Sequence, residues 1–229
     1  MPDPLPNPQL LRSLGKLARG LSALFWGLPA TLLISAETAR TDWLKPLGVL
    51  PLLAINMLVL YGLLQMGDFQ RQERPWRFSL DRALLLAMIN LGLCPFIYWH
   101  NRAPEISYFN YAVILLELSA ILFLFNLNLM LKRLAAMLPD EALRHETRQF
   151  TALNCWLLVM LLFVSTAVVL STELPAIILP AGRIIHLVVR SNLLLLAFLF
   201  LSLLPLALTM ALIWKTKEVI LDAVFGPRG

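Results

Sequence analysis

One carboxylate in an apolar stretch is the residue best placed to do chemistry. Glu117 lies near the middle of the stretch 110–131, which is long enough to cross a bilayer. A charged side chain at that depth costs at least about 2.5–3.5 kcal/mol, so it is usually paired, neutralised or functional. No other acidic or basic residue lies well inside any span that we predict below.

Two asparagines extend this position into a polar line. Asn110 lies seven residues before Glu117 and Asn128 lies eleven after it, and both separations return to nearly the same helix face. The functional interpretation is a site or path for an ion, a proton or a lipid headgroup. In a second interpretation Glu117 is protonated, or is hydrogen-bonded to a polar neighbour such as Asn56 or Asn90, and only holds helices together. In a third it pairs with a charge on a partner subunit, and the sequence leaves all three open.

A second polar set is expected at the outer membrane face. It consists of His100, Arg102, Arg183, His186 and Arg190. Two histidines at one surface suggest metal or haem binding, but they lie on different segments, without a third ligand or a Cys-x-x-Cys-His motif. A site for anionic headgroups or for a periplasmic partner is better supported, and interfacial anchoring is the plainest alternative. We therefore expect no cofactor and no metal.

Motifs of catalysis are missing from the sequence. It contains no Gly-x-Ser-x-Gly, no His-Glu-x-x-His, no phosphate-binding Gly-x-x-x-x-Gly-Lys and no Thr-Val-Gly-Tyr-Gly filter. Serines inside the spans have no Lys or His base at the same depth. We expect no catalytic residue, and an intramembrane enzyme is disfavoured. Cys94 and Cys155 lie near opposite membrane faces and are expected to be free thiols.

Composition places most of the chain in lipid. Hydrophobic residues make up 59% and charged residues 14%, whereas a soluble domain is about 25% charged. Too few polar residues are present to cover a water-exposed surface. The net charge of +5 is then better explained by basic loops facing anionic lipids than by nucleic-acid binding.

The hydrophobic pattern predicts an all-α, polytopic membrane protein, a six-helix bundle with short interfacial helices. Residues 1–20 are expected to form a cytoplasmic amphipathic segment, with a surface helix from Pro8; the alternative is that this helix extends the first span. Residues 21–214 form the transmembrane domain, and 215–229 a cytoplasmic tail. Residues 174–189 are too short an apolar stretch to cross and are expected to be surface-bound or re-entrant. The six spans are 21–36, 46–66, 82–99, 110–131, 150–172 and 193–214.

Basic residues predict the orientation. With the N-terminus inside, the inner segments carry 14 of the 19 Lys and Arg residues, and the outer segments carry the other five, which are Arg40, Lys45, Arg102, Arg183 and Arg190. Such a bias in short loops sets topology. Both termini are expected in the cytoplasm of a bacterial-type inner membrane.

This layout resembles one permease half of the six-span exporter type of ABC transporter, without any residue motif that carries the likeness. The first functional hypothesis is a non-catalytic membrane subunit for transport or export, with the bilayer and a protein partner or second copy as its contacts. The inner segments 67–81 and 132–149 would then be docking surfaces, or else solvated connectors. A self-contained transporter or channel using Glu117 is the alternative, and a haem-binding redox subunit is the third.

Overall fold

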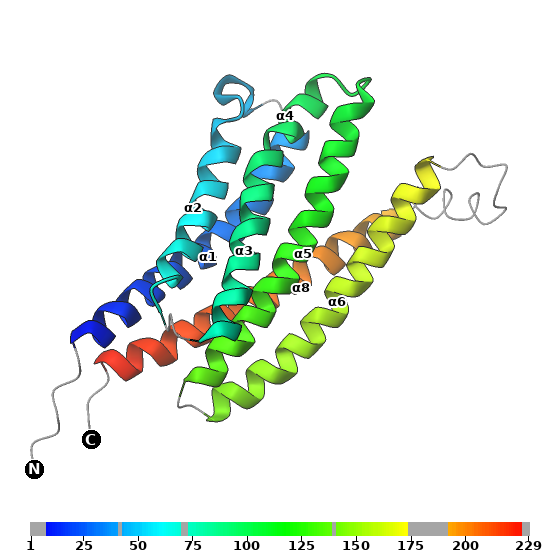
Figure 1. The fold of residues 1–229 in the computed structure, drawn as a ribbon. Helices are drawn as coiled ribbons and strands as arrows, with labels where there is room; N and C mark the ends of the chain where they lie inside the picture. Colours follow the sequence, from blue (N-terminus) through cyan, green and yellow to red (C-terminus); the bar gives the residue numbers. More distant parts are fainter. Residues whose placement is uncertain (1–7, 41–42, 70–72, 139–140, 174–191, 226–229) are drawn as a thin grey trace, which may run out of the picture.

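The protein is a bundle of α-helices. The computed structural model describes residues 8–40, 43–69, 73–138, 141–173 and 192–225 (Figure 1), and none of these residues forms a strand. The all-α prediction is therefore confirmed. In chain order the elements are α1 (Pro8–Arg40), the 3-10 turn η1 (Lys45–Leu47), α2 (Leu50–Met66), α3 (Arg74–Leu93), α4 (Pro95–Arg102), α5 (Ser107–Met137), α6 (Glu141–Glu173) and α8 (Asn192–Phe225).

Within the described residues, five helical segments are long and apolar enough to cross a membrane. α3 and α4 supply one of them jointly, because they meet at Cys94 within the span Arg74–Arg102. α2 has 17 residues and rises only about 25 Å. It is a shorter apolar helix, and it joins the end of α1 to the start of α3 at opposite ends of the bundle (Figure 1).

Helix ends extend further than the sequence suggested. α1 is a single helix from Pro8 to Arg40, so residues 8–20 and the first predicted span belong to one continuous helix. α3 begins at Arg74, inside the stretch expected as a polar loop, and α8 runs on to Phe225 through most of the expected tail. A helix satisfies its own backbone, so it can leave the bilayer without ending at the first polar residue. The surface-bound or re-entrant segment expected at 174–189 lies outside the described residues.

Glycines let α1 and α2 approach closely. A Cβ on Gly20 would lie 2.6 Å from the carbonyl oxygen of Gly62, and a Cβ on Gly62 would lie 2.9 Å from the carbonyl oxygen of Gly20. Two helical turns further along α1, a Cβ on Gly27 would lie 2.9 Å from Cγ2 of Val59. Small residues that bring helix backbones together are a main source of packing energy in lipid.

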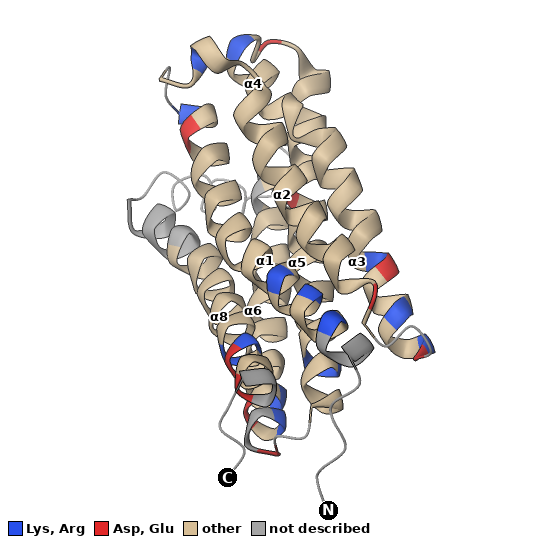
Figure 2. Ribbon diagram, turned by 90° about the vertical axis from the view of Figure 1, so that its left-hand side faces the viewer, with Lys and Arg blue, Asp and Glu red and all other residues tan. Residues whose placement is uncertain are grey.

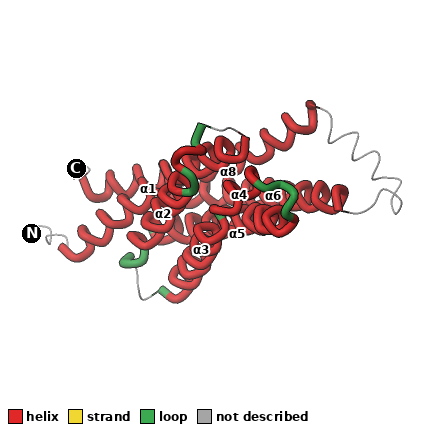
Figure 3. Tube along the Cα trace, turned by 90° about the horizontal axis from the view of Figure 1, so that it is seen from above, coloured by secondary structure: helices red, strands yellow, loops and turns green. Residues whose placement is uncertain are grey.

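α5 has neighbours on three sides. It packs against α3 and α6 along most of its length, and it also touches α8. α8 in turn packs against α1 and α6. Towards the end of α6 and the start of α8, these two helices lean away from α1 and α2 (Figures 1 and 3). α5, α6 and α8 therefore contact one another while α5 and α8 also remain packed against α3 and α1.

Charged residues gather at the two ends of the bundle (Figure 2). We call the end where α1 begins and α8 finishes the basic end, since most of the described Lys and Arg residues lie there. Lys16 forms an ion pair with Asp68, and Lys215 forms one with Glu146. Arg133 on α5 donates to the carbonyl oxygen of Pro75 on α3. These contacts tie the helix ends together where the chain meets water.

Candidate functional site

The carboxylate of Glu117 meets a hydroxyl from another helix. Ser165 on α6 donates a hydrogen bond from Oγ to Oε1 of Glu117 on α5, with a length of 2.8 Å. Ser165 is buried, and Glu117 is half-buried at the α5–α6 contact. A carboxyl group at this depth therefore has a specific polar partner within its own chain.

A second polar centre lies deeper in the bundle, where α5, α6 and α8 meet. It is formed by Asn128, Asn154 and Thr209, each with 0% of its surface exposed. Nδ2 of Asn154 lies 2.9 Å from Oδ1 of Asn128, 2.9 Å from Oγ1 of Thr209 and 3.1 Å from the carbonyl oxygen of Pro205. Nδ2 of Asn128 also donates to Oγ1 of Thr209, at 2.9 Å. We call these three side chains the amide cluster.

An apolar layer separates Glu117 from the amide cluster. Ile121 on α5 and Leu158 and Leu161 on α6 are buried together in one hydrophobic cluster. On α6 the two leucines lie between Asn154 and Ser165 on one helix face, over a rise of about 16 Å. In this conformation the two polar levels are divided by packed side chains.

The predicted line of Asn110, Glu117 and Asn128 is one face of α5, but its members have different surroundings. Asn110 is half-buried near the start of the helix, whereas Asn128 belongs to the fully buried amide cluster. The neighbours suggested for Glu117 do not hold it. Asn56 donates instead to the carbonyl oxygen of Leu52 at 2.8 Å, and the partner of Glu117 is Ser165.

The outer set is only partly within the described residues. Arg183, His186 and Arg190 lie outside them, so the convergence of His100 with His186 stays a prediction. His100 is half-buried, and its Nδ1 has no hydrogen-bond partner. Among the described residues, no group of three or more His, Cys, Asp or Glu side chains is arranged to hold a metal ion. Cys94 and Cys155 are both free thiols, as predicted.

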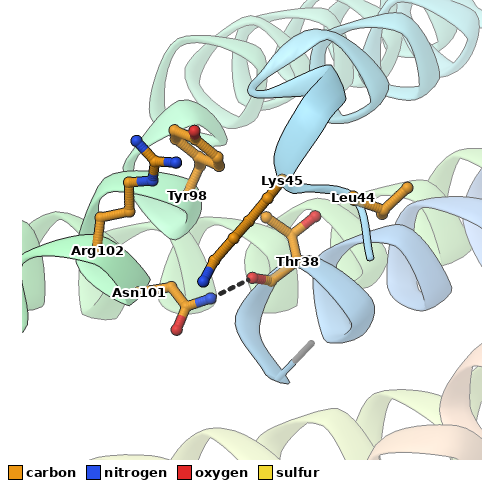
Figure 4. Close-up of a pocket in the computed structure, with 6 residues that line it drawn as sticks. All are labelled: Thr38, Leu44, Lys45, Tyr98, Asn101 and Arg102. Atoms are coloured by element: carbon orange, nitrogen blue, oxygen red, sulfur yellow. Dashed lines mark hydrogen bonds between the residues drawn. The ribbon is translucent and has the colours of Figure 1, made fainter. Parts of the chain in front are cut away.

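A small hollow lies between the end of α1, η1 and α4, at the end opposite to the basic end (Figure 4). Nδ2 of Asn101 donates to the carbonyl oxygen of Thr38 at 3.0 Å, which joins α4 to α1. The guanidinium of Arg102 lies 5.1 Å from the ring centroid of Tyr98. The lining residues are Thr38, Leu44, Lys45, Tyr98, Asn101 and Arg102.

No protein-family model, no curated protein and no solved structure matches this chain. Its function is therefore inferred from its own residues and their geometry. Two features among the described residues could bind or transfer a ligand. They are the Glu117–Ser165 pair, between α5 and α6, and the amide cluster, where α5, α6 and α8 meet.

Sequence reasoning found Glu117 and Asn128 but missed their partners Ser165, Asn154 and Thr209. The α6 partners did leave a signal, because polar residues recur on one face of that helix. The second, third and fourth members come four, seven and eighteen residues after the first, and each lies within about 40° of the first at 100° per residue. The members are Thr147, Thr151, Asn154 and Ser165.

Proposed function

We propose that this protein is a non-catalytic, permease-like transport protein of the membrane that moves a proton together with a small polar solute or a cation. The observation that carries the proposal is the Glu117–Ser165 pair inside the α5–α6 contact. A carboxyl group in a membrane span is expensive to keep there, and such groups mark ion and proton routes. Glu117 is the group that takes up and releases the proton.

The stacking of polar and apolar levels supports this function. Glu117 and Ser165 form one level, Ile121, Leu158 and Leu161 form the apolar layer, and the amide cluster forms the next level. A transporter must open its site to one side at a time. An apolar layer between two polar levels supplies the closed barrier, and a small shift between helices would move it.

Pro205 is a point at which α8 could bend. Proline has no N–H, so the carbonyl of the residue four positions earlier loses its helical donor and the helix is weakened there. Pro205 is buried, and its own carbonyl oxygen accepts hydrogen bonds from both Asn154 and Thr209. The amide cluster is therefore bonded directly to the proline residue of α8.

The test is proton movement in vesicles made with the purified protein. The vesicles enclose a pH-sensitive dye, and gradients of K⁺, Na⁺, amino acids or sugars are imposed across their membrane. We expect at least one gradient to drive proton movement in wild type and Glu117→Gln to abolish it. Glu105→Gln is the matched control, because Glu105 is an exposed carboxylate outside the bundle interior.

Two results would contradict the proposal. One is that wild-type vesicles behave like protein-free vesicles under every gradient. The other is that Glu117→Gln and wild type move protons at the same rate. In both cases the Glu117–Ser165 bond would be a structural contact between helices.

A second candidate is that the protein works as a subunit of a multi-protein assembly. The observation in its favour is a set of exposed Lys and Arg residues on the ends of α3, α5 and α6 at the basic end, where acidic residues also lie (Figure 2). The exposed residues are Arg74, Arg77, Lys132, Arg133, Arg144 and Arg148. Purification in mild detergent with identification of stoichiometric partners tests this, and a lone stable chain argues for a self-contained transporter.

For either candidate we place the basic end in the cytoplasm of a bacterial-type inner membrane. The first turn of α1 and the last turn of α8 lie at this same end (Figure 1), so both described ends of the chain face one side. Support for the choice of side comes from the preference of Lys and Arg for cytoplasmic segments.

A further inference from the structure

Among the side chains that the structure describes, three buried polar atoms on α6 have no hydrogen-bond partner. They are Oγ1 of Thr147, Oγ1 of Thr151 and Oδ1 of Asn154. The exposed fractions of these residues are 1%, 2% and 0%. Because they are spaced at four and three residues, they follow one another along a single face of the helix.

Other threonines in the bundle behave differently. Thr31, Thr38 and Thr216 each donate to the carbonyl oxygen four residues earlier, at 2.7–2.8 Å. This local bond is the usual way for a threonine to satisfy its hydroxyl inside a helix. Thr147 and Thr151 make no such bond, so their hydroxyls are available to another partner.

This face of α6 has polar groups at both of its ends. At the basic end, Thr147 follows Glu146, which pairs with Lys215 at the water boundary. At the other end, Asn154 belongs to the amide cluster, and Leu158 of the apolar layer comes next on the same face. The two unpartnered hydroxyls therefore lie between bulk water and the amide cluster, and the third unpartnered atom belongs to the cluster itself.

We propose that Thr147, Thr151 and Asn154 line an internal file of water molecules that runs from the basic end to the amide cluster. Buried polar groups without protein partners are the groups that internal water satisfies, with two to four hydrogen bonds for each molecule. Water fits this donor set better than a metal ion, since no carboxylate is present to replace an ion's hydration shell. The inference goes beyond the proposed function, because it gives the interior an aqueous route from one side only.

Silver-ion access to single cysteines tests the file. In a Cys94→Ala, Cys155→Ala background, Thr151→Cys is compared with Leu153→Cys and Leu158→Cys in oriented vesicles. Ag⁺ is small, travels only through water and binds thiols irreversibly on the time scale of the assay. After the vesicles are denatured, a thiol reagent measures the cysteines that Ag⁺ did not reach, so a loss of thiol reactivity means that the position was accessible. Leu153 is the matched control, because it lies at the same depth on α6 but is exposed on the lipid-facing side.

We expect Ag⁺ added at the basic end to remove most of the thiol reactivity of Thr151→Cys and little from Leu153→Cys or Leu158→Cys. Thr147→Cys should react as Thr151→Cys does, which keeps the test valid if one variant fails to fold. Equal reactivity of Thr151→Cys and Leu153→Cys, or no reaction of Thr147→Cys and Thr151→Cys, would overturn the water file. Access at Thr151→Cys without proton movement in vesicles would keep the file and remove the transport proposal, whereas proton movement without access would do the reverse.

Discussion

Oγ of Ser165 on α6 lies 2.8 Å from Oε1 of Glu117 on α5. This bond joins the intramembrane carboxylate to the hydroxyl of a residue 48 positions away in the chain. It makes Glu117 part of a built contact between two helices. The strength of this bond determines how much the free energy of unfolding should change when either side chain is replaced.

A double-mutant cycle on this pair should show energetic coupling. Ser165→Ala, Glu117→Gln and the double variant are compared by the free energy of unfolding in detergent. Hydrogen bonds between membrane helices give coupling of about 0.6 kcal/mol on average and about 1.7 kcal/mol at most. We expect a value in this range. Strictly additive effects would mean that the two side chains do not stabilise each other.

Asn154→Ala should be among the most destabilising polar substitutions in the bundle. It removes the donor shared by Asn128, Thr209 and the Pro205 carbonyl and leaves Asn128 Oδ1 buried without that donor. Leaving a buried polar group unsatisfied costs about 1–3 kcal/mol. Asn110→Ala is the control, because Asn110 is half-buried, and we expect a change within about 0.5 kcal/mol there. Equal losses for the two variants would show that the amide cluster contributes nothing special.

Gly20→Ala should destabilise the α1–α2 pair although alanine favours helices. Helix propensity alone would make the alanine variant of α1 more stable than the glycine form by about 0.8–1.0 kcal/mol. The new Cβ would meet the Gly62 carbonyl oxygen at 2.6 Å and Met66 Cγ at 2.8 Å, and a helix backbone cannot move aside as a side chain can. Gly15 on the same helix has nothing within 4 Å of its Cβ position, so Gly15→Ala should be neutral or stabilising.

Thermal unfolding of the two glycine variants in detergent is the measurement. We expect a lower midpoint for Gly20→Ala and an unchanged or higher one for Gly15→Ala. A rise of the midpoint in both variants would mean that α1 and α2 do not pack as closely as the Gly20–Gly62 approach indicates.

The fold class was accessible from the sequence because each span carries its own signal. Long apolar runs at low charge specify membrane helices without knowledge of their neighbours. Burial among helices is a different matter, and Trp76 shows why. It lies between Arg74 and Arg77 in a polar stretch of the sequence, yet it is 1% exposed and packs edge-on against Phe69, with ring centroids 6.0 Å apart.

Only part of the candidate site could be predicted from the sequence. Glu117 stands out because a carboxylate is rare in an apolar span. Ser165 and Thr209 do not stand out, because hydroxyls are common in membrane helices and usually bond their own backbone. Their role follows only from which helices pack together, and that depends on long-range contacts. The recurrence of Thr147, Thr151 and Asn154 on one face of α6 is the sequence pattern that indicates a buried polar face on this helix.

The orientation proposed for the bundle predicts opposite labelling at its two ends. Glu73 and Glu105 are both exposed, and they lie just before α3 at the basic end and before α5 at the other end. In a background without Cys94 and Cys155, Glu73→Cys should react with a membrane-impermeant maleimide only after cells are opened. Glu105→Cys should react in intact spheroplasts, because the basic residues hold the other end in the cytoplasm. The reverse pattern would invert the proposed topology, and labelling of both variants from one side would contradict a bundle that spans the membrane with these ends apart.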